Sequence, residues 1–240
     1  MAALRVPADY GMQAYGIEKI AIVDDESTDA QIPEWEVEAA GFQPILINRR
    51  FRNIEELAAF IKAEAHGAAC AHRLADYGFA HFYGAKLVAS LYDLQIPALL
   101  VTQYADIDND VSIRKWRDKI PVLLHRNEVD ADTIRQGIAK CASELHGDVP
   151  YSRRPHRVLL RITDITDESN EKVVDVIIPS WNPHWAVRFP VALIPGDLHD
   201  MLEIDRAFFA QVNIGAEKAD DLYFQEFEVA PEPDDDDGLA

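Results

Sequence analysis

The stretch Ile20-Ala21-Ile22-Val23-Asp24-Asp25-Glu26 is an apolar run that ends in three carboxylates. Such a run predicts a buried parallel strand, and the ligands of open α/β sheets bind outside the carboxyl ends of their strands. Three adjacent acids there either hold a divalent cation or form a repulsive cluster that neighbouring groups must relieve. The function therefore depends on which residues end the neighbouring strands.

Apolar runs alternate with helical patterns from this strand to residue 145. Gly41 is suited to end the first helix and Asn53 to begin the second, while Pro44 places its strand toward a sheet edge. This alternation predicts a (βα)5 doubly wound parallel sheet. The predicted strands are 17–23, 42–47, 67–71, 96–101 and 121–124, and the predicted helices are 29–40, 54–65, 79–92, 110–118 and 130–145.

The periodicity changes after residues 147–156, which read as a linker by composition. Five short segments with strand-type alternation follow, and they predict a small all-β barrel or sandwich domain. Phe224, Phe227 and Val229 are expected to fill its core from the last strand. These strands are 157–165, 173–179, 186–194, 207–214 and 222–229.

The predicted organisation has five parts. Residues 1–16 form an N-terminal extension, 17–146 the α/β domain, 147–156 the linker and 157–229 the small β domain. Residues 230–240 have almost no apolar content to bury, so they are expected to be a disordered acidic tail.

The charge balance limits the class of partner. The 240 residues carry a formal net charge of −19. Nonspecific binding to a polyanion needs clustered basic side chains, so nucleic acid is not expected as a partner. The one basic cluster is short, and we expect it to form salt bridges with acidic neighbours near the linker. It consists of Arg153, Arg154, His156, Arg157 and Arg161.

The sequence also bears on the compartment. It has no apolar run of about 18 residues, and its N-terminus has no apolar core of signal-peptide length. We therefore expect a cytoplasmic protein that neither spans nor binds a membrane. Cys70 and Cys141 are then expected to be reduced core residues.

Residues 17–146 resemble the receiver domain of two-component response regulators, which has a flavodoxin-like fold. The matching residues are Asp24 and Asp25, the pair Gly41-Phe42, and Thr102 at the end of the fourth strand. In that family the acids bind Mg²⁺ and an aspartate ending the third strand accepts a phosphoryl group. A threonine or serine and a lysine then hold the phosphoryl oxygens. The resemblance implies Asp24 and Asp25 as ligands of Mg²⁺, the one cofactor it suggests.

The site departs from the family's pattern in three places. His72 stands in the acceptor's place, and the fifth strand ends in His125-Arg126 where the family shows Lys-Pro. Gln103 stands where a small residue normally leaves room for the phosphoryl group. The resemblance therefore implies a degenerate receiver, or pseudo-receiver, that cannot be phosphorylated.

Several roles remain open for the strand-end residues. His72 and His125 could neutralise the acids by hydrogen bonding or partial protonation. A working response regulator would need atypical acceptor chemistry, with His72 or the displaced Asp76 as acceptor. A metal-dependent hydrolase would use Asp24, Asp25 and His72 as metal ligands.

The leading hypothesis is a non-catalytic adaptor or regulatory subunit that acts through protein–protein contacts in a signalling complex. Receivers use the face around the fourth strand and fifth helix to form dimers or to bind partners. The resemblance therefore implies Tyr104 and helix 130–145 as contact residues, with a homodimer as one outcome. In the second domain, Trp181, His184 and Trp185 either form an aromatic platform or cover the open end of a barrel. The acidic tail would steer a basic partner, or it serves solubility alone.

Overall fold

A computed structural model of the chain describes residues 15–24, 32–74, 80–103, 109–168 and 171–231. The chain divides into two compact units. The first holds the residues up to 108 together with 119–149, and the second holds 109–118 together with the residues from 150 onward. The second unit is therefore built from two separate stretches of the sequence.

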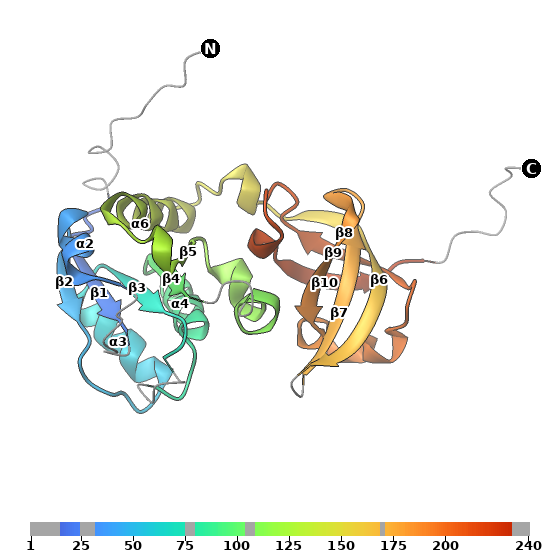
Figure 1. The fold of residues 1–240 in the computed structure, drawn as a ribbon, viewed down its shortest axis with the longest axis horizontal. Coiled ribbons are helices and arrows are strands. Elements are labelled where there is room, and N and C mark those ends of the chain that lie inside the picture. The colour runs from blue at the N-terminus through green and yellow to red at the C-terminus, as the bar shows by residue number, and fades with distance from the viewer. Residues whose placement is uncertain (1–14, 25–31, 75–79, 104–108, 169–170, 232–240) are drawn as a thin grey trace, which may run out of the picture. The chain divides into compact units, whose positions relative to one another are not determined.

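The first unit is built on a parallel sheet of five strands (Figure 1). The strand order is β2-β1-β3-β4-β5, which is the order of flavodoxin-like folds. This order shows a receiver- or flavodoxin-like α/β domain, as the sequence predicts. The strands are β1 (Lys19–Val23), β2 (Gln43–Leu46), β3 (Gly67–Ala71), β4 (Ala98–Thr102) and β5 (Leu123–His125).

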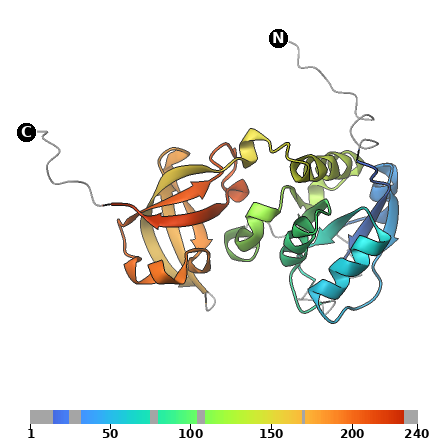
Figure 2. The same cartoon turned by 180° about the vertical axis from the view of Figure 1, so that it is seen from behind.

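Helices cover both faces of this sheet. Helices α2 and α6 pack together on one face, and α3 packs with α4 on the other. Figure 2 shows α3 in cyan and α4 in green in front of the sheet. The helices are α2 (Glu34–Ala39), α3 (Ile54–Glu64), α4 (Gly84–Asp93) and α6 (Ala131–Leu145).

Several residues have the local structural roles that the sequence predicts. The Asn53 side chain accepts a hydrogen bond from the Glu56 backbone N–H over 2.8 Å, so it caps α3. Gly41 has a φ of +92°, which a helix-ending glycine adopts without strain. Strand β2, which contains Pro44, lies at the sheet edge, and Cys70 and Cys141 are buried cysteines that are not joined in a disulfide.

The segment between β4 and β5 differs from the prediction of a helix over 110–118. It forms a π-helical turn (Asn109–Ile113) and a 3-10 helix (Arg114–Lys119), and residues 109–118 belong to the second unit. The reason is a set of hydrogen bonds to residues far away in the sequence. The Arg114 guanidinium donates hydrogen bonds to the carbonyls of Ala219 and Leu222 over 2.7 and 2.8 Å.

Two more buried arginines complete this attachment. Arg117 donates to the Asp220 carbonyl and pairs with the Asp221 carboxylate at 2.6 Å. Arg153 donates to the carbonyls of Arg117 and Asp118. Because guanidinium groups carry several donors in a fixed plane, each of these side chains can satisfy two acceptors at once.

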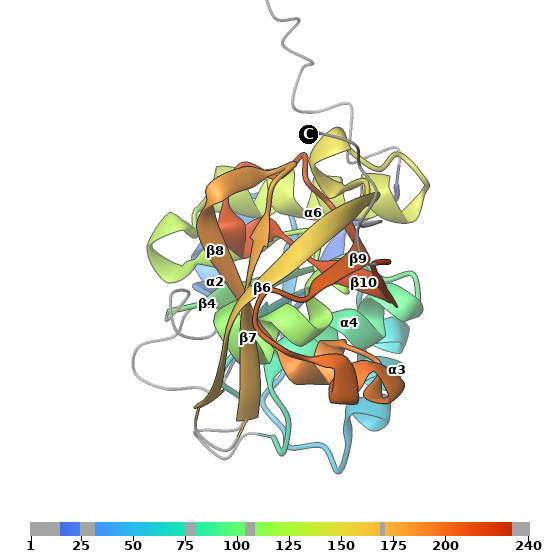
Figure 3. The ribbon, with the colours of Figure 1, turned by 90° about the vertical axis from the view of Figure 1, so that its right-hand side faces the viewer.

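The second unit contains an antiparallel sheet in the order β10-β9-β6-β7-β8. Figure 3 looks onto this sheet, with β6 and β7 crossing the front of the view. All five predicted strands are present within a few residues of their predicted bounds. They are β6 (His156–Glu168), β7 (Glu171–Ile178), β8 (Asn182–Pro190), β9 (Ala207–Val212) and β10 (Phe224–Val229).

Aromatic side chains from the two edge strands of this sheet meet in its core. The Phe189 ring of β8 lies 4.4 Å from the Phe224 ring and 5.7 Å from the Phe227 ring, both on β10, measured between centroids. Register shifts put extra residues into β6, β8 and β10, and irregularities of this kind bend a strand. The sheet is thus curled enough that side chains of its two edge strands, β10 and β8, meet on the inner face.

The predicted basic cluster is largely engaged with acidic and aromatic neighbours. Arg157 pairs with Glu228 at 2.8 Å and lies over the Phe209 ring. Arg161 lies 3.7 Å from Asp205.

In the described part of the chain, no helix has both the length and the apolar character needed to cross a bilayer.

The N-terminus of α6 gives a pH-dependent contribution to stability. Asp130 accepts a hydrogen bond from the Thr133 backbone N–H, and this bond holds the Asp130 pKa below its usual 3.8. A lowered folded-state pKa stabilises the fold above pH 3.8, and this stabilisation is lost as the pH falls through the folded value. Asp130→Asn should keep the cap but lose this pH dependence. Urea unfolding followed by circular dichroism should show a shallower acid loss for the variant, and parallel losses would contradict the assignment.

The arginine attachment of 109–118 predicts a large effect for one substitution. Arg114→Met removes the guanidinium that donates to the Ala219 and Leu222 carbonyls, so we expect it to destabilise the second unit by about 2–4 kcal/mol. Lys115→Met is the matched control. Lys115 forms only a partly exposed ion pair with Glu171, so its loss should cost below about 1 kcal/mol. Equal urea midpoints for the two variants would argue against the attachment.

Candidate functional site

The predicted site residues lie at the carboxyl ends of neighbouring strands. Asp24 follows β1, His72 follows β3, and Thr102 and His125 end β4 and β5. Thr102 and His125 are direct partners in the β4–β5 register. The His72 backbone N–H donates to the Val101 carbonyl over 2.8 Å, which places it beside the end of β4. The sheet order thus brings these four residues to one edge.

Asp24 is a nearly buried carboxylate. Its Oδ2 accepts a hydrogen bond from the Ile32 backbone N–H over 3.2 Å, which ties the residues before α2 to the end of β1. Burial raises the pKa of the adjacent Cys70 thiol well above its usual value, and the charge of Asp24 raises it further. Cys70 is therefore a neutral thiol beside a fixed negative charge.

His72, which stands in the acceptor's place, is fully buried. Its ring stacks on the Tyr83 ring with centroids 5.2 Å apart and planes inclined by 20°. Its carbonyl accepts a hydrogen bond from the Gly84 N–H over 2.7 Å. Tyr83 and Gly84 begin α4, so the start of this helix covers the end of β3.

This close approach depends on a glycine. A Cβ at position 84 would lie 1.9 Å from the Ala71 carbonyl oxygen, which no side chain tolerates. The predicted helix over 79–92 placed Gly84 in its interior, but the structure begins α4 at this glycine. A glycine in a helical pattern was the available signal for both the helix start and the close contact.

The other two strand-end residues are also held in the fold. Thr102 is fully buried. The His125 ring Nδ1 lies 2.7 Å from the Asn127 side-chain oxygen, and the His125 backbone N–H donates to Glu128. His125 thus caps the short 3-10 turn Arg126–Glu128. This is a structural role in addition to the predicted neutralisation of the acids.

Three predicted site residues fall outside the described residues. They are Asp25, Tyr104 and the alternative acceptor Asp76. Within the described ranges, no three His, Cys, Asp or Glu side chains come together as ligands of a metal ion. Since the predicted set includes Asp25, the metal site stays a prediction.

A cavity of about 310 Å³ lies beside Asp24. It is bounded by the ends of β1 and β2 and by the start of α2. Trp35 and Leu46 contribute to it and are 67% and 46% exposed. Trp35 is not among the residues predicted from the sequence, although a tryptophan between Glu34 and Glu36 at a helix start is an unusual surface residue. The principal lining residues are Asp24, Ile32, Trp35, Leu46, Ile47 and Asn48.

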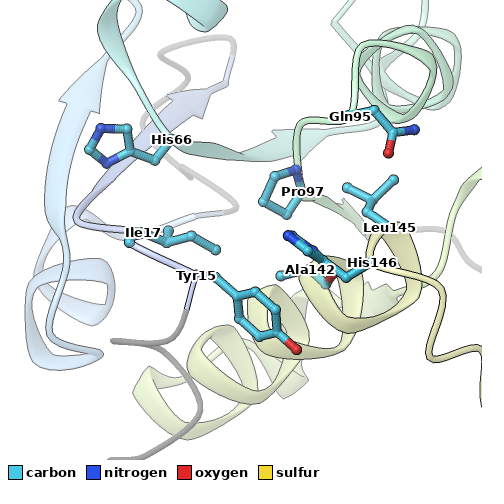
Figure 4. Close-up of a pocket in the computed structure, with 9 residues that line it drawn as sticks. Tyr15, Ile17, His66, Gln95, Pro97, Ala142, Leu145 and His146 are labelled. Carbon is cyan, nitrogen blue, oxygen red and sulfur yellow. The ribbon is translucent and has the colours of Figure 1, made fainter.

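A second cavity, of about 240 Å³, is formed by residues that precede β1, β3 and β4 and by the end of α6 (Figure 4). Two histidines line it, but both hold the backbone. His66 Nδ1 accepts hydrogen bonds from the N–H groups of Glu18 and Lys19, and His146 Nδ1 lies 2.8 Å from the Ala142 carbonyl. The Tyr15 ring packs against His146 with centroids 4.8 Å apart. These contacts give the histidines structural roles at the start of β1 and the end of α6.

The two tryptophans of the second unit have different environments. Trp181 packs against the core, and its ring N–H donates to the Ala216 carbonyl over 2.8 Å. Trp185 is 66% exposed, and His184 is exposed beside it. The structure therefore places Trp181 as a ring that covers the core, which leaves Trp185 and His184 as the exposed pair.

Comparisons with known proteins do not assign the chain to a family. No protein-family model and no curated protein matches the chain. Among solved structures, the chain is similar to the crystal structure of a response regulator receiver domain protein from Clostridium thermocellum. That match covers 53% of this chain and 96% of the other, with 16% sequence identity and a TM-score of 0.40. The assignment of the α/β fold therefore rests on the order of the strands.

The covered end of β3 leads to a stability prediction. Gly84→Ala forces a methyl group into the Ala71 carbonyl, so we expect a loss of about 3 kcal/mol or more and increased exposure of His72. Gly196→Ala is the control, since a Cβ there meets nothing within 4 Å. Urea unfolding and hydrogen exchange of α4 would measure the two effects. Similar behaviour of the two variants would refute the close contact.

Proposed function

We propose that this protein is a non-catalytic adaptor or regulatory subunit. Its first unit would be a receiver-like domain that cannot be phosphorylated, and both units would act through protein–protein contacts. The observation that carries the proposal is the state of His72. In the acceptor's place stands a fully buried imidazole stacked under Tyr83, where acyl-phosphate chemistry needs an accessible carboxylate.

The residues around His72 support the same conclusion. Phosphoryl transfer depends on cations placed to neutralise the phosphoryl oxygens. His125 occupies the position of the expected lysine and is bonded to Asn127. Thr102 is fully buried, so its hydroxyl is not open to an incoming phosphodonor.

We infer that the second unit is a small barrel that serves as an interaction module. Support comes from the contact between Phe189 and Phe224, which joins the inner faces of the two edge strands. Trp185 is a large apolar side chain exposed on this unit. With a net charge of −19, electrostatic attraction favours a basic protein partner in the cytoplasm.

The proposal is tested by attempting phosphorylation of the full chain. The protein is incubated with acetyl phosphate and Mg²⁺ and its intact mass is measured, with a phosphorylatable receiver domain treated in parallel. We expect no phosphoryl adduct on this chain and a clear one on the control. A stoichiometric adduct would overturn the adaptor proposal in favour of a response regulator with atypical acceptor chemistry.

A further inference from the structure

We propose that the cavity beside Asp24 is the docking site for a segment of a protein partner that inserts one lysine or arginine side chain between apolar neighbours. This inference rests on the proposed adaptor function and names the chemistry of its partner. The described residues that line the cavity come from β1, β2, the segments that follow them and the start of α2, and none belongs to α6, the helix implied as a contact surface by the receiver resemblance.

The cavity has the size of a side-chain pocket. Its volume of about 310 Å³ lies at the lower end of the range for ligand pockets, which suits one long side chain better than a large cofactor. Its walls are mostly apolar and come from three elements. Ile22 belongs to β1, Leu46 ends β2, and Ile32 precedes α2.

The mouth of the cavity carries two exposed apolar side chains. Single exposed hydrophobic residues are ordinary on protein surfaces. Trp35 and Leu46, however, line the same cavity from different elements and are both more than 40% exposed. Tryptophan is enriched among residues that dominate binding energy, because its large ring loses much water-exposed area on contact.

The charge of the lining selects a cation. Among the described residues that line the cavity, the charged ones are Asp24 and Glu34, and both are acidic. Asp24 already accepts the Ile32 hydrogen bond, so it is not a vacant ligand position, and the exposed Glu34 adds a second carboxylate. The Trp35 ring face adds a surface that attracts ammonium or guanidinium groups. Arg49, in the loop after β2, has its guanidinium over the Phe51 and Phe60 rings and does not line the cavity.

The arrangement therefore suits a long basic side chain. The methylene stem of lysine or arginine would lie along the isoleucines, and its charged end would reach toward Asp24. The apolar neighbours of that residue in the partner would cover Trp35 and Leu46. An acidic peptide would meet like charge at Glu34 and Asp24 and is excluded.

The test selects ligands with the full chain. A phage-displayed library of random peptides is panned against the protein, and the enriched peptides are synthesised and titrated. We expect them to share a lysine or arginine beside an apolar residue. Trp35→Ala should weaken their binding about tenfold or more, as should replacing the peptide's basic residue by norleucine.

Trp185→Ala is the matched control, because Trp185 is as exposed as Trp35 but belongs to the second unit. It should leave binding unchanged, and circular dichroism should show both variants folded. Enriched peptides without a shared basic residue, or equal binding by Trp35→Ala and the wild type, would overturn the proposal. So would agmatine binding as tightly as the peptides, since the ligand would then be a small organic cation.

This inference and the adaptor proposal fail in different experiments. A phosphoryl adduct would reject the adaptor proposal without affecting the peptide measurements. Loss of the peptide consensus would reject the docking site and leave the phosphorylation result as it stands.

Discussion

The arrangement at the carboxyl edge of the parallel sheet depends on the contact between the start of α4 and the end of β3. The Gly84 N–H donates to the His72 carbonyl over 2.7 Å, and the backbones are so close that a Cβ at position 84 would lie 1.9 Å from the Ala71 oxygen. This contact brings Tyr83 over the His72 ring. The start of α4 therefore lies directly against the end of β3. In the proposed loss of phosphorylation, this backbone contact would matter as well as the identity of one side chain.

The second unit depends on a different interaction, the donation of guanidinium hydrogen bonds to main-chain carbonyls. Arg114, Arg117 and Arg153 are buried, and each bonds at least one carbonyl of a distant segment. Burying a charge is costly unless its donors are satisfied, and here the carbonyl oxygens, with the Asp221 carboxylate at Arg117, contribute that compensation. Asn213 works in the same way, joining Ser152, Asp221 and Tyr223 through its amide. The unit is therefore held by polar contacts to residues 109–118 and 150–155 as well as by its aromatic core.

The sequence carried enough information for most of the fold. Apolar runs ending at turn residues located the ten strands found in the described ranges, and the local signals at Gly41, Pro44 and Asn53 identified a helix end, an edge strand and a cap. The prediction that residues 110–118 form a helix of the α/β domain was wrong. Its apolar spacing suits a helix, but Arg114 and Arg117 bond to residues about a hundred positions later. Long-range hydrogen bonds of this kind leave no trace in local periodicity.

The candidate site was predicted less completely for the same reason. Strand ends can be read from the sequence, so Asp24, His72, Thr102 and His125 could be placed at one edge. Their surroundings could not. The stacking of Tyr83 on His72, the bond from His125 to Asn127 and the cavity at Trp35 each join residues through a loop or across two elements. Trp181 and Trp185 show the same limit, because two tryptophans four residues apart were equivalent in sequence but only one packs on the core.

Asp24 links the covered strand end to the cavity on its other side. Burial removes much of the hydration of the Asp24 carboxylate, and the hydrogen bond from the Ile32 backbone N–H is one of the contacts that compensate for this loss. In a phosphorylatable receiver a metal ion and its ligands would share this charge. Asp24 also lines the cavity, together with the acidic Glu34 and the exposed ring of Trp35. Under the proposals above, a strand-end acid that serves metal binding in receivers would here help to attract a basic side chain of a partner, so the same position in the fold would support a different kind of binding.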